Sequence, residues 1–118
     1  MASSVEFNSV DKIAFNAVDG DWSTRWASEW TDWEWIYVDL GASMPINRVV
    51  LDWEDAFGKE YLIRLSNDAT TWETVYHEKQ GYFGEHACYM NSNARYVKMT
   101  GIKRGTSWGY SLFEFNIF

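Results

Sequence analysis

The chain has 118 residues, a single cysteine (Cys88) and a net charge of −7 at pH 7. This length suits one domain with one core, the lone cysteine excludes an internal disulfide, and no apolar run reaches the roughly 20 residues of a membrane span. The acidic charge disfavours nucleic acid and anionic lipid surfaces, because both attract lysine and arginine. Eight tryptophans, seven tyrosines and seven phenylalanines exceed the needs of a core, so some rings are expected to be exposed for stacking.

Alternating apolar residues and frequent turn signals predict an all-β antiparallel sandwich of seven or eight short strands. After an entry strand or loop over Val5–Ile13, the predicted strands are Trp35–Leu40, Asn47–Glu54, Tyr61–Leu65, Trp72–His77, Arg95–Met99 and Ser111–Phe118, with Tyr89–Met90 ambiguous. The predicted loops and turns are Ala27–Glu34, Gly41–Pro45, Asp55–Lys59, Ser66–Ala69, Gln80–Glu85 and Ile102–Gly109. In the last strand, Phe113, Phe115 and Ile117 are expected on one face.

The stretch Asn16–Trp26 holds the densest group of oxygen-bearing side chains. Carboxylates and hydroxyls are the ligands that calcium prefers, and Gly20 allows the backbone to turn tightly enough for Asp19 and Asp21 to face one point. The alternative is an Asx-type turn between two strands. An EF-hand is excluded, because its twelfth position counted from Asp19 is Trp30 instead of a glutamate. A calcium site here therefore needs a ligand from a distant part of the chain.

Catalytic motifs have little support, and the chain is expected not to be an enzyme. Cys88, His77 and His86 lack the sequence context of a nucleophilic triad, and one cysteine with two histidines at this separation does not indicate zinc. With seventeen acidic residues, some pair will match the spacing of glycosidase carboxylates by chance.

Six short motifs follow one another along the chain. They are Ala17–Trp26, Trp35–Gly41, Trp53-Glu54-x-Ala56, Tyr61-x-Ile63 with Ser66-x-Asp68, Ala94–Val97, and Gly109–Phe115. In this order they resemble the factor V/VIII type C (discoidin-like) superfamily, and within it the family 32 carbohydrate-binding modules most closely. The resemblance implies a jelly-roll β-sandwich like the galactose-binding domains, with residues 1–118 forming one non-catalytic module. It also implies a secreted, multidomain glycoside hydrolase as the parent protein and a monomeric module.

The resemblance further implies one structural calcium ion. Carried over to this sequence, the ligands are the side chains of Asp19, Asp21, Thr24 and Glu114 and the backbone carbonyls of Asn16, Thr24 and Phe113. Such an ion would join the first loop to the last strand and add its binding energy to folding stability. One departure from the family pattern is Asp68-Ala69, where members usually carry Asp-Gly.

Family members bind glycans on loops at one end of the sandwich, which here are Glu29–Trp33, Glu54–Lys59, Tyr82–Phe83 and Thr106–Tyr110. Trp108 is the expected stacking platform, because no strand alternation places it inward. Trp26, Trp53 and Trp72 are instead assigned to core or inter-strand packing. The predicted sugar-binding residues are Glu29, Trp30, Asp32, Glu54, Lys59 and Trp108.

The sugar itself stays open at this point. Acidic side chains beside aromatic rings suit the cationic amino-sugar polymer chitosan, but also a neutral β-glucan, β-mannan or galactoside. Pectin and alginate are disfavoured by the acidic charge. The alternative function is a discoidin-type adhesion domain that binds a protein or phospholipid surface. Tyr82-Phe83 would then be a hydrophobic spike, although Glu85 and the net charge oppose a membrane.

Overall fold

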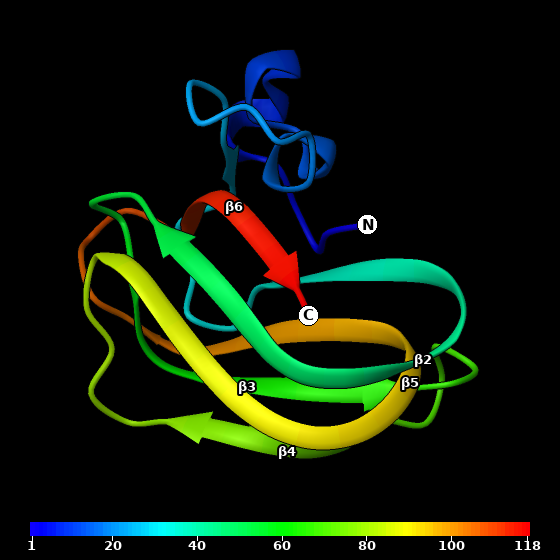
Figure 1. Ribbon diagram of the computed structural model, residues 1–118. Coiled ribbons are helices and arrows are strands. Elements are labelled where there is room, and N and C mark those ends of the chain that lie inside the picture. Colours follow the sequence, from blue (N-terminus) through cyan, green and yellow to red (C-terminus); the bar gives the residue numbers. More distant parts are fainter.

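Two long, bent strands connect the two layers of the fold (Figure 1). The computed structural model describes all 118 residues. Strands β2 (Trp35–Trp53) and β5 (Gly84–Arg104) run antiparallel to each other through both layers. Their pairing is irregular between Asp39 and Met44, where β2 bends from the first layer into the second.

The remaining strands pair with β2 and β5, so that all strands are hydrogen-bonded in the order β1-β6-β2-β5-β3-β4. One layer contains β1 (Trp26–Ala27), β6 (Ser111–Ile117) and the halves of β2 and β5 that adjoin them. The other layer contains β3 (Gly58–Ser66), β4 (Glu73–Glu78) and the remaining halves of β2 and β5. Every ladder is antiparallel, which confirms the predicted all-β sandwich.

Three single-turn helices precede the sandwich, and the first two of them occupy the segment Val5–Ile13 that was predicted as an entry strand or loop. They are the 3-10 helices η1 (Glu6–Asn8), η2 (Val10–Lys12) and η3 (Ala14–Ala17). Helix η3 packs against β1 and β6, so the N-terminal segment sits over the edge of one layer. No helix in the chain is long and apolar enough to cross a membrane.

The core lies between the two layers and consists of 17 buried residues. Trp26 and Trp53 are fully buried in it, as predicted. Trp72 instead packs outside the core, with its ring centroid 5.6 Å from that of Tyr37 and 6.4 Å from that of Tyr96. It therefore has the inter-strand packing role that was expected as the alternative to the core.

Several predicted strand boundaries are wrong. Gly41–Pro45 is not a turn between two strands but the bend inside β2, and Tyr89–Met90 lies within β5. The predicted loops over Asp55–Lys59, Gln80–Glu85 and Ile102–Gly109 are shorter, because β3 begins at Gly58, β5 begins at Gly84 and β5 ends at Arg104. All residues of Gly41–Pro45 are exposed, so this part of β2 lacks the one-sided burial that gives a strand its alternation.

A β-bulge changes which residues of β6 face inward. Glu114 pairs with Asp52, but the next β2 residue, Trp53, pairs with Leu112, so Phe113 is the extra residue of the bulge. Leu112 and Phe115 therefore belong to the core, whereas Phe113 does not. The prediction that Phe113 shares one face with Phe115 and Ile117 is wrong for this reason.

Candidate functional site

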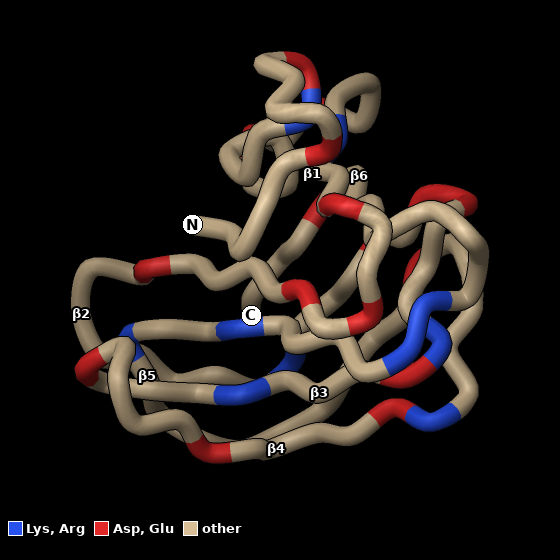
Figure 2. The backbone as a smooth tube through the Cα atoms, turned by 180° about the vertical axis from the view of Figure 1, so that it is seen from behind, with Lys and Arg blue, Asp and Glu red and all other residues tan.

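The loops predicted to bind sugar gather at the end of the sandwich that lies on the left in Figure 1. Residues 28–34 and 54–57 meet there with residues 79–83 and 105–110, because each of these loops joins strand ends on that side. Seen from behind, red acidic segments recur through the N-terminal segment, which also carries blue basic ones, and through its neighbouring loops, while blue segments recur along β3 and β5 (Figure 2). The loop end thus borders the more acidic part of the molecule.

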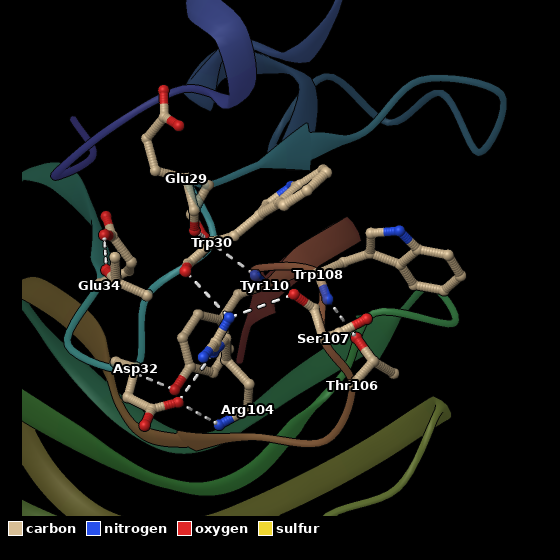
Figure 3. A network of polar contacts seen from close by, with 11 residues as sticks. Glu29, Trp30, Asp32, Glu34, Arg104, Thr106, Ser107, Trp108 and Tyr110 are labelled. Carbon is tan, nitrogen blue, oxygen red and sulfur yellow. Dashed lines mark hydrogen bonds and ion pairs between the residues drawn. The ribbon is translucent and has the colours of Figure 1, made fainter.

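Hydrogen bonds join the loop at 28–34 to the loop at 105–110 (Figure 3). The backbone amide of Tyr110 donates to Oγ of Ser28 at 2.9 Å, and the Tyr110 hydroxyl donates to the carbonyl of Asp32 at 2.6 Å. Burial of the Tyr110 ring raises the pKa of its hydroxyl, which keeps it a donor. The two loops therefore form one connected unit.

Arg104, the last residue of β5, links the same two loops. Its Nη1 donates to the carbonyl oxygens of Trp30 at 2.9 Å and Ser107 at 3.2 Å. Its Nε and its backbone amide both donate to Oδ1 of Asp32, at 2.9 and 3.1 Å. The side-chain hydrogen bond from Arg104 is the main reason that the pKa of Asp32 is lowered. Asp32 therefore fixes Arg104 in position.

A cleft of about 320 Å³ opens between the rings of Trp30 and Trp108. Trp30 is 45% exposed and Trp108 is 50% exposed. The indole Nε1 of Trp30 donates to Oε2 of Glu6 at 2.7 Å, and the ring of Phe7 meets Trp30 edge-on with centroids 5.4 Å apart. Figure 3 shows both indole rings reaching away from the Asp32–Arg104 pair, on the same side of the loops.

Polar groups form the inner wall of this cleft. Nη1 of Arg25 donates to Oγ of Ser111 at 2.6 Å and lies 3.5 Å from Oε1 of Glu54. The same oxygen of Glu54 accepts from the amide of Ala56, whereas Oε2 has no partner in the chain. The wall therefore offers one carboxylate oxygen to a ligand beside a fixed guanidinium.

The six predicted sugar-binding residues do not all reach this cleft. Trp30, Glu54 and Trp108 line it, while Glu29, Asp32 and Lys59 do not. The Glu29 side chain points away from the two rings (Figure 3). Their roles toward a ligand stay predictions.

Sequence reasoning did not single out nine further residues of the cleft, although Ala56, Gly109 and Tyr110 lie in loops that were predicted to bind sugar. The nine are Glu6, Phe7, Arg25, Ala27, Ser28, Ala56, Gly109, Tyr110 and Ser111. Outside those loops, the one available signal was an acidic residue beside an aromatic one at Glu6-Phe7, in a segment without alternation.

The second candidate site is the loop between η3 and β1. Gly20 has φ +71°, the left-handed conformation that favours glycine. The Thr24 hydroxyl donates to Oδ2 of Asp19 at 2.5 Å, and this bond is the main cause of the lowered pKa of Asp19. Asp21 instead accepts from the hydroxyl of Ser23 at 2.6 Å and from its amide. This local geometry is that of consecutive Asx turns.

Glu114 of β6 lies beside this loop and is only 2% exposed. Its Oε1 has no hydrogen-bond partner. Burial, and then the nearby charge of Asp19, raises the pKa of Glu114. A buried carboxylate with an orphaned oxygen, next to a second carboxylate, is a setting that a cation would stabilise.

Two of the other predicted calcium ligands belong to elements that adjoin these carboxylates. Phe113 is the bulge residue, unpaired in register with β2, and Asn16 lies in η3, which packs against β6. No three carboxylate, imidazole or thiolate side chains converge in a metal-binding arrangement, and Asp21 is hydrogen-bonded to Ser23. The donors that fit calcium are therefore two carboxylates, one hydroxyl and the backbone carbonyls.

The chain is similar to several solved carbohydrate-binding modules. Chitosan-binding module 1 from a chitosanase/glucanase of Paenibacillus sp. IK-5 is 44% identical with a TM-score of 0.95, covering 100% of this chain and 92% of that one. Module 2 of the same enzyme, solved with chitotriose, is 38% identical with a TM-score of 0.95, over 100% and 93% of the two chains. The family 32 module of Clostridium perfringens NanJ, solved with galactose, shares the fold at 20% identity, with a TM-score of 0.85 over 99% and 90%.

One curated relative is the polysaccharide lyase 8 family protein HylA of Enterococcus faecalis. It is 35% identical over 95 residues, which cover 77% of this chain and 7% of the lyase. The family model described as F5/F8 type C, NedA-like, galactose-binding domain matches residues 16–99. With its sandwich topology and its solved neighbours, this match shows that the chain belongs to the F5/F8 type C, galactose-binding-like family that includes the family 32 carbohydrate-binding modules.

Proposed function

We propose that this chain is a non-catalytic carbohydrate-binding module that binds chitosan in the cleft between Trp30 and Trp108. The observation that carries the proposal is the cleft itself, in which two half-exposed indole rings face the same opening. Indole faces stack on the apolar faces of sugar rings, and a fixed ring loses little conformational freedom on binding. Trp30 is fixed by Glu6 and Phe7 before any ligand arrives.

The charge of the cleft favours an amino sugar over an acidic one. Glu6 and Glu54 both line the cleft, and Arg25 is already paired with Glu54 and Ser111. The whole chain carries a net charge of −7. A carboxylate accepts strong hydrogen bonds from an ammonium group, so protonated glucosamine units suit this wall. The similarity to two chitosan-binding modules supports the same choice.

The test is affinity electrophoresis in gels that contain glycol chitosan, β-glucan, β-mannan or galactan. We expect retardation by the chitosan derivative and loss of that retardation in Trp108→Ala. The matched control is Trp33→Ala, because Trp33 is 70% exposed in the same group of loops but does not line the cleft. Undiminished retardation of Trp108→Ala would refute this cleft as the binding site. Retardation by a neutral glycan alone would mean that the ligand is that glycan and not chitosan.

We also propose that the loop of Asp19 and the buried Glu114 bind a structural calcium ion. The ligands would be the side chains of Asp19, Thr24 and Glu114, with Asp21 turning toward the ion and the carbonyls of Asn16, Thr24 and Phe113 completing the shell. The orphaned Oε1 of Glu114 supports this proposal. Calcium would supply positive charge that compensates two neighbouring carboxylates and would hold the first loop on the last strand.

In the same proposal, residues 1–118 act as one monomeric module of a larger extracellular glycoside hydrolase or lyase. The relatives that support it are a chitosan-binding module of a chitosanase/glucanase and a polysaccharide lyase 8 family protein. Tethering raises the local concentration of a catalytic domain on its polysaccharide even when the binding of each module is weak.

A further inference from the structure

Two aromatic rings outside the cleft remain exposed at the same end of the sandwich. Tyr82 is 63% exposed and Phe83 is 52% exposed, in the loop between β4 and β5. Their rings stack on each other with centroids 4.5 Å apart and an interplanar angle of 29°. Neither ring belongs to the core or to the partly buried residues packed against it.

The loop at 54–57 connects this pair to the cleft. Ala56 lines the cleft, and the ring of the next residue, Phe57, lies 5.9 Å from that of Tyr82. The carbonyl of Phe57 accepts from the amide of Gly105 at 2.9 Å, at the start of the loop that carries Trp108. Trp108, Phe57 and the Tyr82–Phe83 pair therefore belong to adjoining loops along one end of the molecule (Figure 1).

The loop of the pair is held rigidly before any ligand binds. The amide of Gly81 donates to the carbonyl of Lys59 at 2.7 Å, and a side chain at Gly81 would collide with the carbonyl of Gly58. On the other side, Gly84 turns the chain into β5 with φ +87°. A fixed aromatic surface binds a ligand without the entropy cost of ordering a flexible loop.

We propose that Tyr82 and Phe83 form a second stacking position for the same polysaccharide chain, so that the module binds an extended internal segment and not only one or two sugar units. This inference rests on the proposed function, because it continues the cleft of Trp30 and Trp108. Its occupant is a later sugar ring of the bound polymer. A lipid surface is the less suitable occupant, because Glu85 adjoins the pair and the chain is acidic.

The test measures affinity for glucosamine oligomers of increasing length by titration calorimetry. We expect the affinity of the wild-type chain to rise from dimer to trimer to hexamer. Phe83→Ala and Tyr82→Ala should weaken hexamer binding roughly two- to tenfold, the range expected for one aromatic stacking contact, and leave dimer binding unchanged. Tyr89→Ala is the matched control, because Tyr89 is 68% exposed in β5 but outside the loop end. Both loop variants should keep the wild-type melting temperature.

The outcomes separate the two proposals. Hexamer binding no tighter than dimer binding, or equal losses at every length in Phe83→Ala, would overturn the second stacking position and leave the cleft intact. No binding of any oligomer by the wild-type chain would overturn both. Co-sedimentation of the wild type with phosphatidylserine vesicles that is lost in Phe83→Ala would assign the pair to a membrane and overturn the inference.

Discussion

At the scale of single residues, one arginine holds both walls of the cleft in place. A guanidinium has five donors in a fixed plane, and Arg104 uses them on the carboxylate of Asp32 and on carbonyls of the two loops that carry Trp30 and Trp108. Neither Arg104 nor Asp32 lines the cleft. The pair therefore contributes to binding by holding the loops of Trp30 and Trp108 in position and not by contacting the ligand.

Replacing Arg104 should weaken sugar binding without unfolding the protein. In Arg104→Met the two loops lose three hydrogen bonds from the side chain, so the indole rings are less well ordered before binding. We expect affinity for chitosan oligomers to fall on the order of three- to tenfold, as measured by calorimetry. Arg95→Met is the control, because Arg95 forms a comparable ion pair with Asp39 away from the loops. Equal effects of both variants would contradict a specific role for Arg104.

The Asp32–Arg104 pair also predicts a pH dependence of stability. Because the pKa of Asp32 is lowered in the folded state, its contribution is fully present above the ordinary aspartate pKa of about 3.9 and is lost as the pH falls through the lowered value. The difference in melting temperature between wild type and Asp32→Asn should stay constant from neutral pH to about pH 5, and shrink below about pH 4. A difference that widens in acid would contradict this sign.

At the scale of elements, the parts of the fold that the sequence predicts are those in which one face is buried. Ile36, Val49, Ile63 and Val97 lie in the core and alternate with neighbours that are only partly buried or exposed. The bend of β2 was not predictable in this way, because Gly41–Pro45 is exposed on both faces. The candidate site shows the same limit of prediction from sequence. Trp108 is recognisable as an aromatic residue in a polar loop, whereas Arg25 reaches the cleft only because β1 pairs with β6.

The turn after β3 stores backbone strain at one position. Ala69 has φ +60°, a conformation that costs a residue with a Cβ roughly 1–2 kcal/mol. Asp68 enforces this turn, because its Oδ1 accepts from the amides of Thr70 and Thr71 at 2.9 and 2.8 Å. Ala69→Gly should therefore stabilise the protein by up to about 1 kcal/mol, after the greater unfolded-state entropy of glycine is subtracted. Urea unfolding measures this, with Ala42→Gly, in the exposed bend of β2, expected not to stabilise.

The contact between the first loop and β6 gives a prediction whose sign depends on calcium. In chelator, Glu114→Gln removes the charge of a buried, unpaired oxygen and should raise the melting temperature or leave it unchanged. With calcium at about a hundredfold excess over its Kd, the wild type should gain about 2.7 kcal/mol, whereas the variant should gain little. Asp11→Asn, an exposed acid outside the loop, should respond to calcium as the wild type does. Identical wild-type melts in calcium and in chelator would refute the calcium proposal.

At the scale of the whole molecule, the distribution of charge distinguishes between the ligands that the cleft geometry alone leaves open. Stacking on Trp30 and Trp108 suits any polysaccharide with an apolar ring face. The net charge of −7 and the acidic residues of the N-terminal segment instead attract only a cationic polymer. The contribution of charge is therefore separable from that of stacking by ionic strength.

Chitosan binding should weaken as salt increases, at a pH where the amines of the polymer are protonated. The Debye length shrinks from about 10 Å at 0.1 M salt to about 3 Å at 1 M, so attraction between exposed charges is screened while ring stacking persists. Calorimetry over this range should show falling affinity for chitosan oligomers, with a shallower slope in Glu54→Gln because Glu54 lines the cleft. Glu73→Gln, on the exposed surface of β4, should change the slope less. Affinity that is independent of salt would mean that stacking alone drives binding, and a neutral glycan would then be the better ligand.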